Sequence, residues 1–208
     1  MTALAGLPVY LDLATVLNLG ENISTQLHTK TQGWTDEQIV LSLILLNLAG
    51  GNCVDDLRIL EGDQGFCRLL EGIELKGLSR KQRRERQRRW RKEKHRSVPS
   101  ASAVFRYLAA FHEEYAPEAG KAVIPPLTDM LLALEHINTD FTAAIQMRNP
   151  LDTTTLEHGC NPHRNRKEGC PHPYKGYKAY QPLNTYWAEQ GLMLHTEFRD
   201  GNVPAGYE

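Results

Sequence analysis

The pattern of apolar and polar positions changes character near residue 150. Before that point, apolar residues recur at the three- and four-residue spacing that is typical of helices. After it, Tyr, Thr and Leu fill short extended-looking runs, with Gly191 between two of them, which predicts two strands and a turn. We therefore predict an α+β chain, with an all-α region over 1–147 and strands within 148–208.

Local start and stop signals mark the first predicted helix. Thr35 is followed three residues later by Gln38, which is the spacing of a capping box. A nearly continuous apolar run over 39–48 follows, and Gly50 and Gly51 stop it. The length of the apolar run predicts a buried helix.

Three further helices are predicted from similar signals. Two short ones cover 53–62 and 65–72, and each ends at a glycine. A third begins after Pro99, with Ser100 as its N-cap. Its predicted apolar face consists of Val104, Leu108 and Phe111.

A long helix is predicted to start at Pro126, and Asn138 is the place where it would break. Apolar residues recur along it at helical spacing. They are Leu127, Leu131, Leu134, Ile137, Phe141 and Ile145.

Composition is that of a globular protein, with 41% hydrophobic and 24% charged residues. No stretch approaches the roughly 18 apolar residues that a membrane span needs. The apolar N-terminus has no basic residue before Lys30 and is interrupted by Pro8 and Asp12, which argues against a signal peptide. Four cysteines do not suggest a disulfide scaffold. We therefore expect a cytoplasmic protein.

Charge is distributed very unevenly along the chain. The segment 80–96 holds eleven Lys or Arg and two Glu, a local charge of +9, so the rest of the chain carries −10. Such a basic segment predicts a polyanionic partner, most often nucleic acid, and Trp90 within it could stack on a base. The alternative is a solvated, highly charged linker. The predicted DNA-binding residues here are Arg83, Arg84, Arg88, Arg89, Arg91 and Lys92.

A cluster of cysteines and histidines follows Leu156. Cys160, His163, Cys170 and His172 could form a tetrahedral zinc site. However, the Cys-x-His spacing of the second pair is too tight for a comfortable chelate loop. The spacing therefore favours an irregular loop with incidental ligands over zinc.

Four segments, taken in order, resemble the DDE transposases of insertion-sequence family 1380. They are GWTDEQIVLSLILLNLAGGNCVDDLRILEGDQGFCRLL, VPSASAVFRYLAAFHEE, YKGYKAYQPLNTYWAEQGL and EFRDGNVPAG. The resemblance covers about Gly33 to Glu208. It implies a helical DNA-contacting domain over 1–147 that includes the basic segment 80–96. It also implies that 148–208 is the truncated start of a ribonuclease H-like α/β domain, in which the intact family holds Mg²⁺ with three carboxylates.

The resemblance is interrupted where the first of these carboxylates belongs. The family motif resembles Thr-Leu-Asp-Met-Asp-Ala-Thr-Leu, and its second Asp is catalytic. This chain matches through Leu156, departs for about seventeen residues, and matches again at Tyr174. Codons for 158–172 read one base later can spell the missing motif, so we interpret the stretch as a compensated frameshift. The cysteines and histidines would then be out of frame, and the gene sequence tests this.

Alignment without gaps puts Gly159 at the catalytic position, and glycine has no side chain that could bind a metal ion. Three acidic residues are weak substitutes: Glu157, Asp152 and Asp200. Asp200 is better explained as a turn residue with Gly201 and Asn202. The second and third carboxylates are expected beyond residue 208. We therefore expect no bound metal in this chain and no intact catalytic site.

Lys175 and Lys178 lie in the family's Tyr-Lys-Gly segment. They would approach DNA phosphates or lie at a strand edge, and both interpretations stay open.

Three functions follow as expectations. The first is DNA transposition, with this chain as an N-terminal fragment of a DDE transposase that is inactive alone. The second is a DNA-binding remnant that modulates transposition without catalysis. The third is a zinc-dependent regulator. Expected partners are the DNA ends of the element, a second copy or full-length transposase, and no membrane. The expected location is the bacterial cytoplasm, at the nucleoid.

Overall fold

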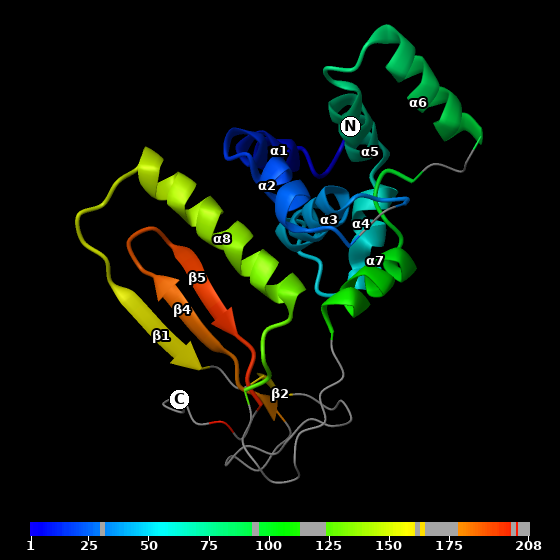
Figure 1. Cartoon of the computed structure of the whole chain (residues 1–208). Helices are drawn as coiled ribbons and strands as arrows, with labels where there is room; N and C mark the ends of the chain where they lie inside the picture. The colour runs from blue at the N-terminus through cyan, green and yellow to red at the C-terminus, as the bar shows by residue number, and fades with distance from the viewer. Residues whose placement is uncertain are drawn as a thin grey trace. The chain divides into compact units, whose positions relative to one another are not determined.

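The computed structural model describes residues 1–29, 32–92, 96–112, 124–160, 163–164, 179–200 and 203. Within these residues the fold is mixed but mostly helical, with eight α-helices and a three-stranded antiparallel sheet (Figure 1). This confirms the prediction of an α+β chain at that level. The chain divides into two compact units, 1–111 and 112–208.

The first unit is helical. Its α-helices are α1 (Leu7–Val16), α2 (Leu19–Gln26), α3 (Asp36–Leu48), α4 (Leu57–Gly62), α5 (Gln64–Leu75), α6 (Arg80–Lys92) and α7 (Ala101–Leu108). Two short 3₁₀ turns are η1 (Val54–Asp56) and η2 (Ala109–Phe111). The predicted capping box is confirmed, because the Thr35 hydroxyl accepts from the Gln38 amide while the Gln38 side chain accepts from the Thr35 amide. Ser100 caps α7 as predicted.

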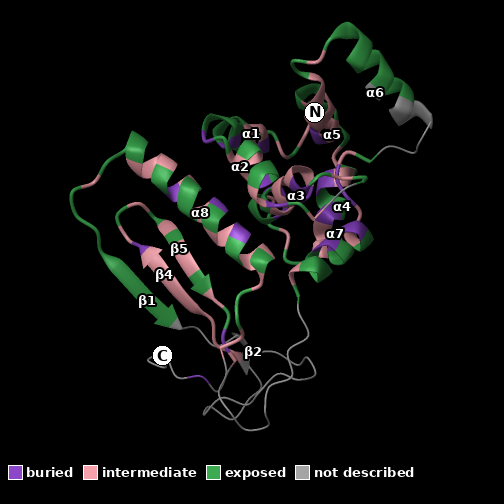
Figure 2. Ribbon diagram, in the orientation of Figure 1, coloured by how far each residue is buried: buried purple, intermediate pink, exposed green. Residues whose placement is uncertain are grey.

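A hydrophobic core stabilises this unit. Buried residues from α3, α4 and α7 contribute to it, as Figure 2 shows for α4 and α7. Each large apolar side chain that is fully buried stabilises the fold by about 1.5–3 kcal/mol. The core residues are Leu7, Ile39, Leu45, Leu46, Leu57, Leu60, Phe66, Val98, Val104 and Tyr107.

The predicted end of α5 at Gly72 is wrong, because the helix continues to Leu75. A glycine within a helix costs only about 1 kcal/mol relative to alanine, so it weakens a helix without ending it. The turn comes instead at Gly77, whose φ of 81° lies in the left-handed region that favours glycine.

The predicted apolar face of α7 also needs correction. Tyr107 is 2% exposed and packs in the core, whereas Leu108 is 39% exposed. Val104 is fully buried and Phe111 packs against the core, as predicted. The α-helix ends at Leu108 and tightens into η2, and the Phe111 ring meets the Tyr107 ring edge-on, at a centroid distance of 5.2 Å.

The second unit combines one helix with strands. Its elements are α8 (Asp129–Arg148), β1 (Leu156–Cys160), β2 (His163–Arg164), β3 (Ala179–Tyr180), β4 (Leu183–Trp187) and β5 (Leu192–Glu197). The sheet order is β1-β4-β5, with both pairs antiparallel, and β2 pairs with β3. Gly191, at a φ of 67°, lies in the turn between β4 and β5. The predicted pair of strands and their turn is confirmed.

Helix α8 differs from its prediction at two points. It begins after the N-cap Thr128 rather than at Pro126, and Leu127 lies before it, 42% exposed. It continues through Asn138, whose side-chain amide donates to the Met193 and Leu194 carbonyls of β5, at 3.2 and 2.7 Å. The helix therefore belongs to the same unit as the strands, whereas its sequence pattern grouped it with the preceding helices.

Candidate nucleic-acid interface

Helix α6 carries the densest positive charge of the chain on an exposed surface. Nine of its thirteen residues are Lys or Arg and one is Glu. Every described side chain of α6 is exposed, namely 80–85, 87 and 88 (Figure 2). The basic residues among them are Arg80, Lys81, Arg83, Arg84 and Arg88. The segment is therefore a helix that turns no described side chain into the core.

A capping box holds the start of α6. The Gln82 side-chain oxygen accepts from the Ser79 amide at 2.9 Å and from the Ser79 hydroxyl at 2.8 Å. The Ser79 oxygen accepts in turn from the Gln82 amide at 3.4 Å. Arg80 and Lys81 oppose the helix dipole in the first turn, which has no acidic residue. The cap therefore offsets an unfavourable charge arrangement. The Ser-x-x-Gln spacing was visible in the sequence, but our sequence analysis did not use it.

The backbone that follows the basic segment is hydrogen-bonded to α4. One carboxylate oxygen of Glu61 accepts from the backbone amides of Ser97 and Val98, both at 3.1 Å. Val98 and Pro99 are fully buried, so the return is part of the core. The Arg96 side chain, at the end of the segment, donates to the Val98 carbonyl at 3.3 Å. No local sequence pattern predicted this role for Glu61.

The described side chains of α6 take part in none of the close contacts between described basic and acidic side chains. Those contacts join Arg58 to Asp56, His195 to Glu135, and Arg199 to Glu197. Like charges at this density repel one another, so an external polyanion would stabilise the helix.

The acidic residues predicted as weak catalytic substitutes lie in or beside the sheet. Glu157 lies in the exposed strand β1, opposite Tyr186 of β4. Asp152 lies on an exposed bend before that strand. Asp200 follows β5 and forms a bridge with Tyr180, and its burial raises the pKa of its carboxyl.

Gly159 lies two residues after Glu157 in β1, so the two positions share one face of the strand. A Cβ atom added at Gly159 would meet nothing within 4 Å. Across the described residues, no group of three His, Cys, Asp or Glu could hold a metal ion. The three acidic substitutes are therefore not brought together.

Several predicted site residues fall outside the described part. Lys175, Lys178, Cys170 and His172 are among them. The backbones of Cys160 and His163 lie in β1 and β2, and those of Arg89, Arg91 and Lys92 lie in α6, but their side chains are outside the description. The zinc set and these DNA contacts therefore remain predictions.

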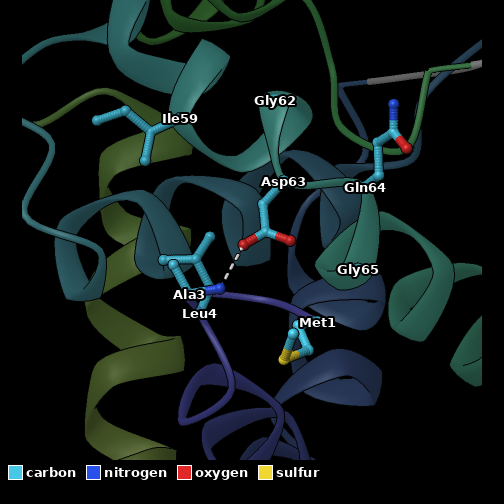
Figure 3. Close-up of a pocket in the computed structure, with 8 residues that line it drawn as sticks. All are labelled: Met1, Ala3, Leu4, Ile59, Gly62, Asp63, Gln64 and Gly65. Carbon is cyan, nitrogen blue, oxygen red and sulfur yellow. Dashed lines mark hydrogen bonds between the residues drawn. The ribbon is translucent and has the colours of Figure 1, made fainter.

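A surface pocket of about 450 Å³ lies where α4 meets α5 (Figure 3). Its most polar side chain is Asp63, which caps α5 by accepting from the Phe66 amide. The same carboxylate accepts from the Thr2 hydroxyl and the Ala3 amide, both at 2.8 Å. These hydrogen bonds, led by that from Phe66, lower the pKa of Asp63. The carboxylate therefore holds the N-terminal segment in place, and both its oxygens are engaged by the chain itself.

Comparison of the chain with protein-family models, with curated proteins and with solved structures found no match. Among the described residues, the helices are too short or too polar for any of them to cross a membrane. The exposed basic surface of α6 is therefore the feature of the described residues that points most directly to a function.

Proposed function

We propose that this chain binds DNA through α6, as part of a DDE transposase that resembles insertion-sequence family 1380. The single observation that carries the proposal is a helix with nine Lys or Arg among thirteen residues, whose described side chains are all exposed. Folded surfaces need far less charge than this for solubility. Cations at this density bind phosphates and release the counterions that DNA condenses around itself.

The local order of the basic segment supports a binding role over that of a loose linker. The Ser79–Gln82 capping box stabilises the start of α6 itself, and Glu61 binds Ser97 and Val98, which follow the segment. A binding element that is already helical loses less conformational entropy when it binds its ligand. The folded helix therefore favours contact with DNA.

The residues present do not fit the metal chemistry of the family. Mg²⁺ requires hard oxygen ligands, and the position that aligns with the first carboxylate is Gly159. Glu157 is exposed on the same face of β1 but has no acidic neighbour within a metal-binding group of described residues. We therefore propose that this polypeptide neither cleaves nor joins DNA, and we derive no metal-dependent step. The ribonuclease H-like character of 148–208 is part of the same proposal.

A second candidate is a remnant that modulates transposition without catalysis. The observation that favours it is that α6 and its anchors lie in the helical unit and do not depend on Gly159. Such a protein would occupy the element ends, or pair with full-length transposase, in the bacterial cytoplasm at the nucleoid. Adding the purified chain to a strand-transfer reaction of intact transposase distinguishes the two candidates. Inhibition supports the remnant, and no effect contradicts it.

The proposal is tested by fluorescence anisotropy with a labelled DNA duplex. The triple variant K81Q/R83Q/R88Q removes three exposed cations and keeps good helix formers. At about 0.1 M salt we expect its affinity to fall by roughly two to three orders of magnitude, since each lost phosphate contact costs about tenfold. The matched control R58Q/R68Q/R106Q removes three exposed cations elsewhere in the same unit. Equal losses in both variants would contradict the proposal.

A further inference from the structure

Helix α6 has the length and thickness of an element that enters a DNA groove. Its thirteen residues span about 20 Å at 1.5 Å per residue, and a helix with its side chains is about 10–12 Å thick. The major groove of B-form DNA is about 12 Å wide and admits one α-helix. The Ser79–Gln82 capping box stabilises the start of the helix itself, and Glu61 of α4 binds Ser97 and Val98, which follow the basic segment. The size of the helix therefore suits the groove.

The five described cations of α6 lie in one arc of the helix. At about 100° per residue, they cover roughly 160° of the helix circumference. Of the other basic positions, 91 falls within this arc, 92 just beyond it, and 86 and 89 outside it. Arg83 lies at one margin of this arc and Lys81 at the other, while Arg80 and Arg84 lie between them. Arg88 lies near the margin of Lys81. A flat polyanionic surface would need only one narrow row of cations, whereas a groove presents phosphates on both walls and base edges on its floor.

We infer that α6 lies in the major groove of B-form duplex DNA, with Arg83 and Lys81 toward the phosphates of opposite strands and Arg80 and Arg84 toward the base edges. This inference rests on the proposed function. Arginine suits the floor of the groove because its planar guanidinium binds guanine O6 and N7 in bidentate fashion. Arg83 donates one N–H to the Leu78 carbonyl at 3.0 Å. The four remaining N–H donors of its guanidinium stay available for phosphate.

Other polyanions fit this helix less well. A helix on an anionic membrane needs an apolar face, and the described side chains of α6 are all charged or polar. The major groove of A-form RNA is deep and narrow, so a helix does not enter it readily. Single strands are bound by several stacked aromatic side chains, and Trp90 is the one aromatic residue in the sequence of α6. Duplex DNA is therefore the favoured ligand.

The inference is tested with three forms of one DNA duplex. The first is unmodified, the second carries glucosylated hydroxymethylcytosines that fill the major groove, and the third is saturated with a minor-groove-binding drug. We expect the affinity of the full chain to fall at least tenfold on the second and by less than twofold on the third. An RNA duplex of the same sequence is expected to bind at least tenfold more weakly than the unmodified DNA.

The outcomes separate this inference from the proposed function. Three results would overturn the major-groove placement and leave DNA binding intact. They are equal affinity for the glucosylated and unmodified duplexes, a clear loss of affinity with the minor-groove drug, and equal affinity for the RNA duplex. If no duplex binds, the proposed function fails as well. Single variants K81Q and R83Q should each make the salt dependence of binding shallower by about one phosphate contact. If neither variant changes the salt dependence, the assignment of Lys81 and Arg83 to the phosphates of opposite strands is overturned.

Discussion

The helical unit buries a continuous core, whereas the sheet of the second unit leaves its first strand open. Phe66, Leu60 and Val104 in the first unit are fully buried. In the second unit, residues 156–159 of β1 are all exposed, and Leu156 is 47% exposed. Burial of apolar surface is the main term that stabilises a fold. The comparison teaches that the helical unit is stabilised mainly by its buried interior, while the described residues of β1 contribute little apolar burial to theirs.

The largest expected effect tests the difference in burial directly. Phe66→Ala empties a fully buried position and should lower the free energy of unfolding by about 3–5 kcal/mol. Phe198→Ala is the matched change in the second unit, where the ring is 51% exposed. It should cost less than about 1 kcal/mol, including its contact with Tyr180. Denaturant unfolding, monitored by hydrogen exchange in each unit, measures the loss of stability in both variants. Equal losses would contradict the expected difference in burial between the two units.

A smaller effect is expected at the anchor of the basic segment. Glu61→Ala removes the acceptor for the Ser97 and Val98 amides and should destabilise the helical unit by about 1–2 kcal/mol. It should also weaken DNA binding, because the return from α6 is no longer fixed. Glu61→Gln keeps an acceptor oxygen and should retain most of both properties. Unchanged DNA affinity in the alanine variant, measured where the protein is folded, would show that the anchor does not position α6.

A pH effect is expected at the N-terminal segment. Hydrogen bonds from Phe66, Thr2 and Ala3 lower the pKa of Asp63 below its ordinary value of 3.8. A carboxyl whose pKa is lower in the folded state contributes stability that is fully present above the unfolded value. That stability is lost as pH falls from about 3.8 through the folded pKa. Unfolding curves at a series of acidic pH values should therefore show a weaker pH dependence for Asp63→Asn. Identical curves for the two proteins would contradict this.

The smallest effect is expected in the exposed strand. Gly159→Asp places a carboxylate where the family resemblance expects one, and its Cβ meets nothing within 4 Å. We expect a change in unfolding free energy within about 0.5 kcal/mol and no strand cleavage, because one added carboxylate does not complete a metal site. Gly65→Ala is the contrasting change in the helical unit, since its Cβ would lie 2.7 Å from the Met1 carbonyl oxygen. A larger loss for Gly159→Asp than for Gly65→Ala would reverse the comparison.

The parts of the fold that the sequence predicted are those with local causes. The Thr35–Gln38 capping box, the Ser100 cap and the turn at Gly191 each depend on a few neighbouring residues. The end of α5 and the continuity of α8 could not be predicted in the same way. Gly72 lacks the left-handed conformation that ends a helix, and Asn138 is held by strand β5, which lies 55 residues further along the chain.

The same distinction between local and long-range causes applies to the candidate interface. Charge composition alone predicted the basic segment, because charge density does not depend on the fold. Its anchoring by Glu61 depends on a contact with Ser97, 36 residues away, that no short pattern contains. The positions of Glu157 in β1, Asp152 before it and Asp200 after β5 likewise depend on the fold and not on residue type.

The salt dependence of DNA binding tests the central claim most directly. For the full chain we predict that the logarithm of the association constant falls against the logarithm of salt concentration with a slope of about −3 or steeper. Lys81, Arg83 and Arg88, which lie toward the two margins of the helix, account for about three phosphate contacts. The slope of the variant K81Q/R83Q/R88Q should be shallower by about 2.7, whereas R58Q/R68Q/R106Q should keep the slope of the full chain. A slope near zero, or one that the α6 variant leaves unchanged, would contradict the assignment of DNA binding to this helix.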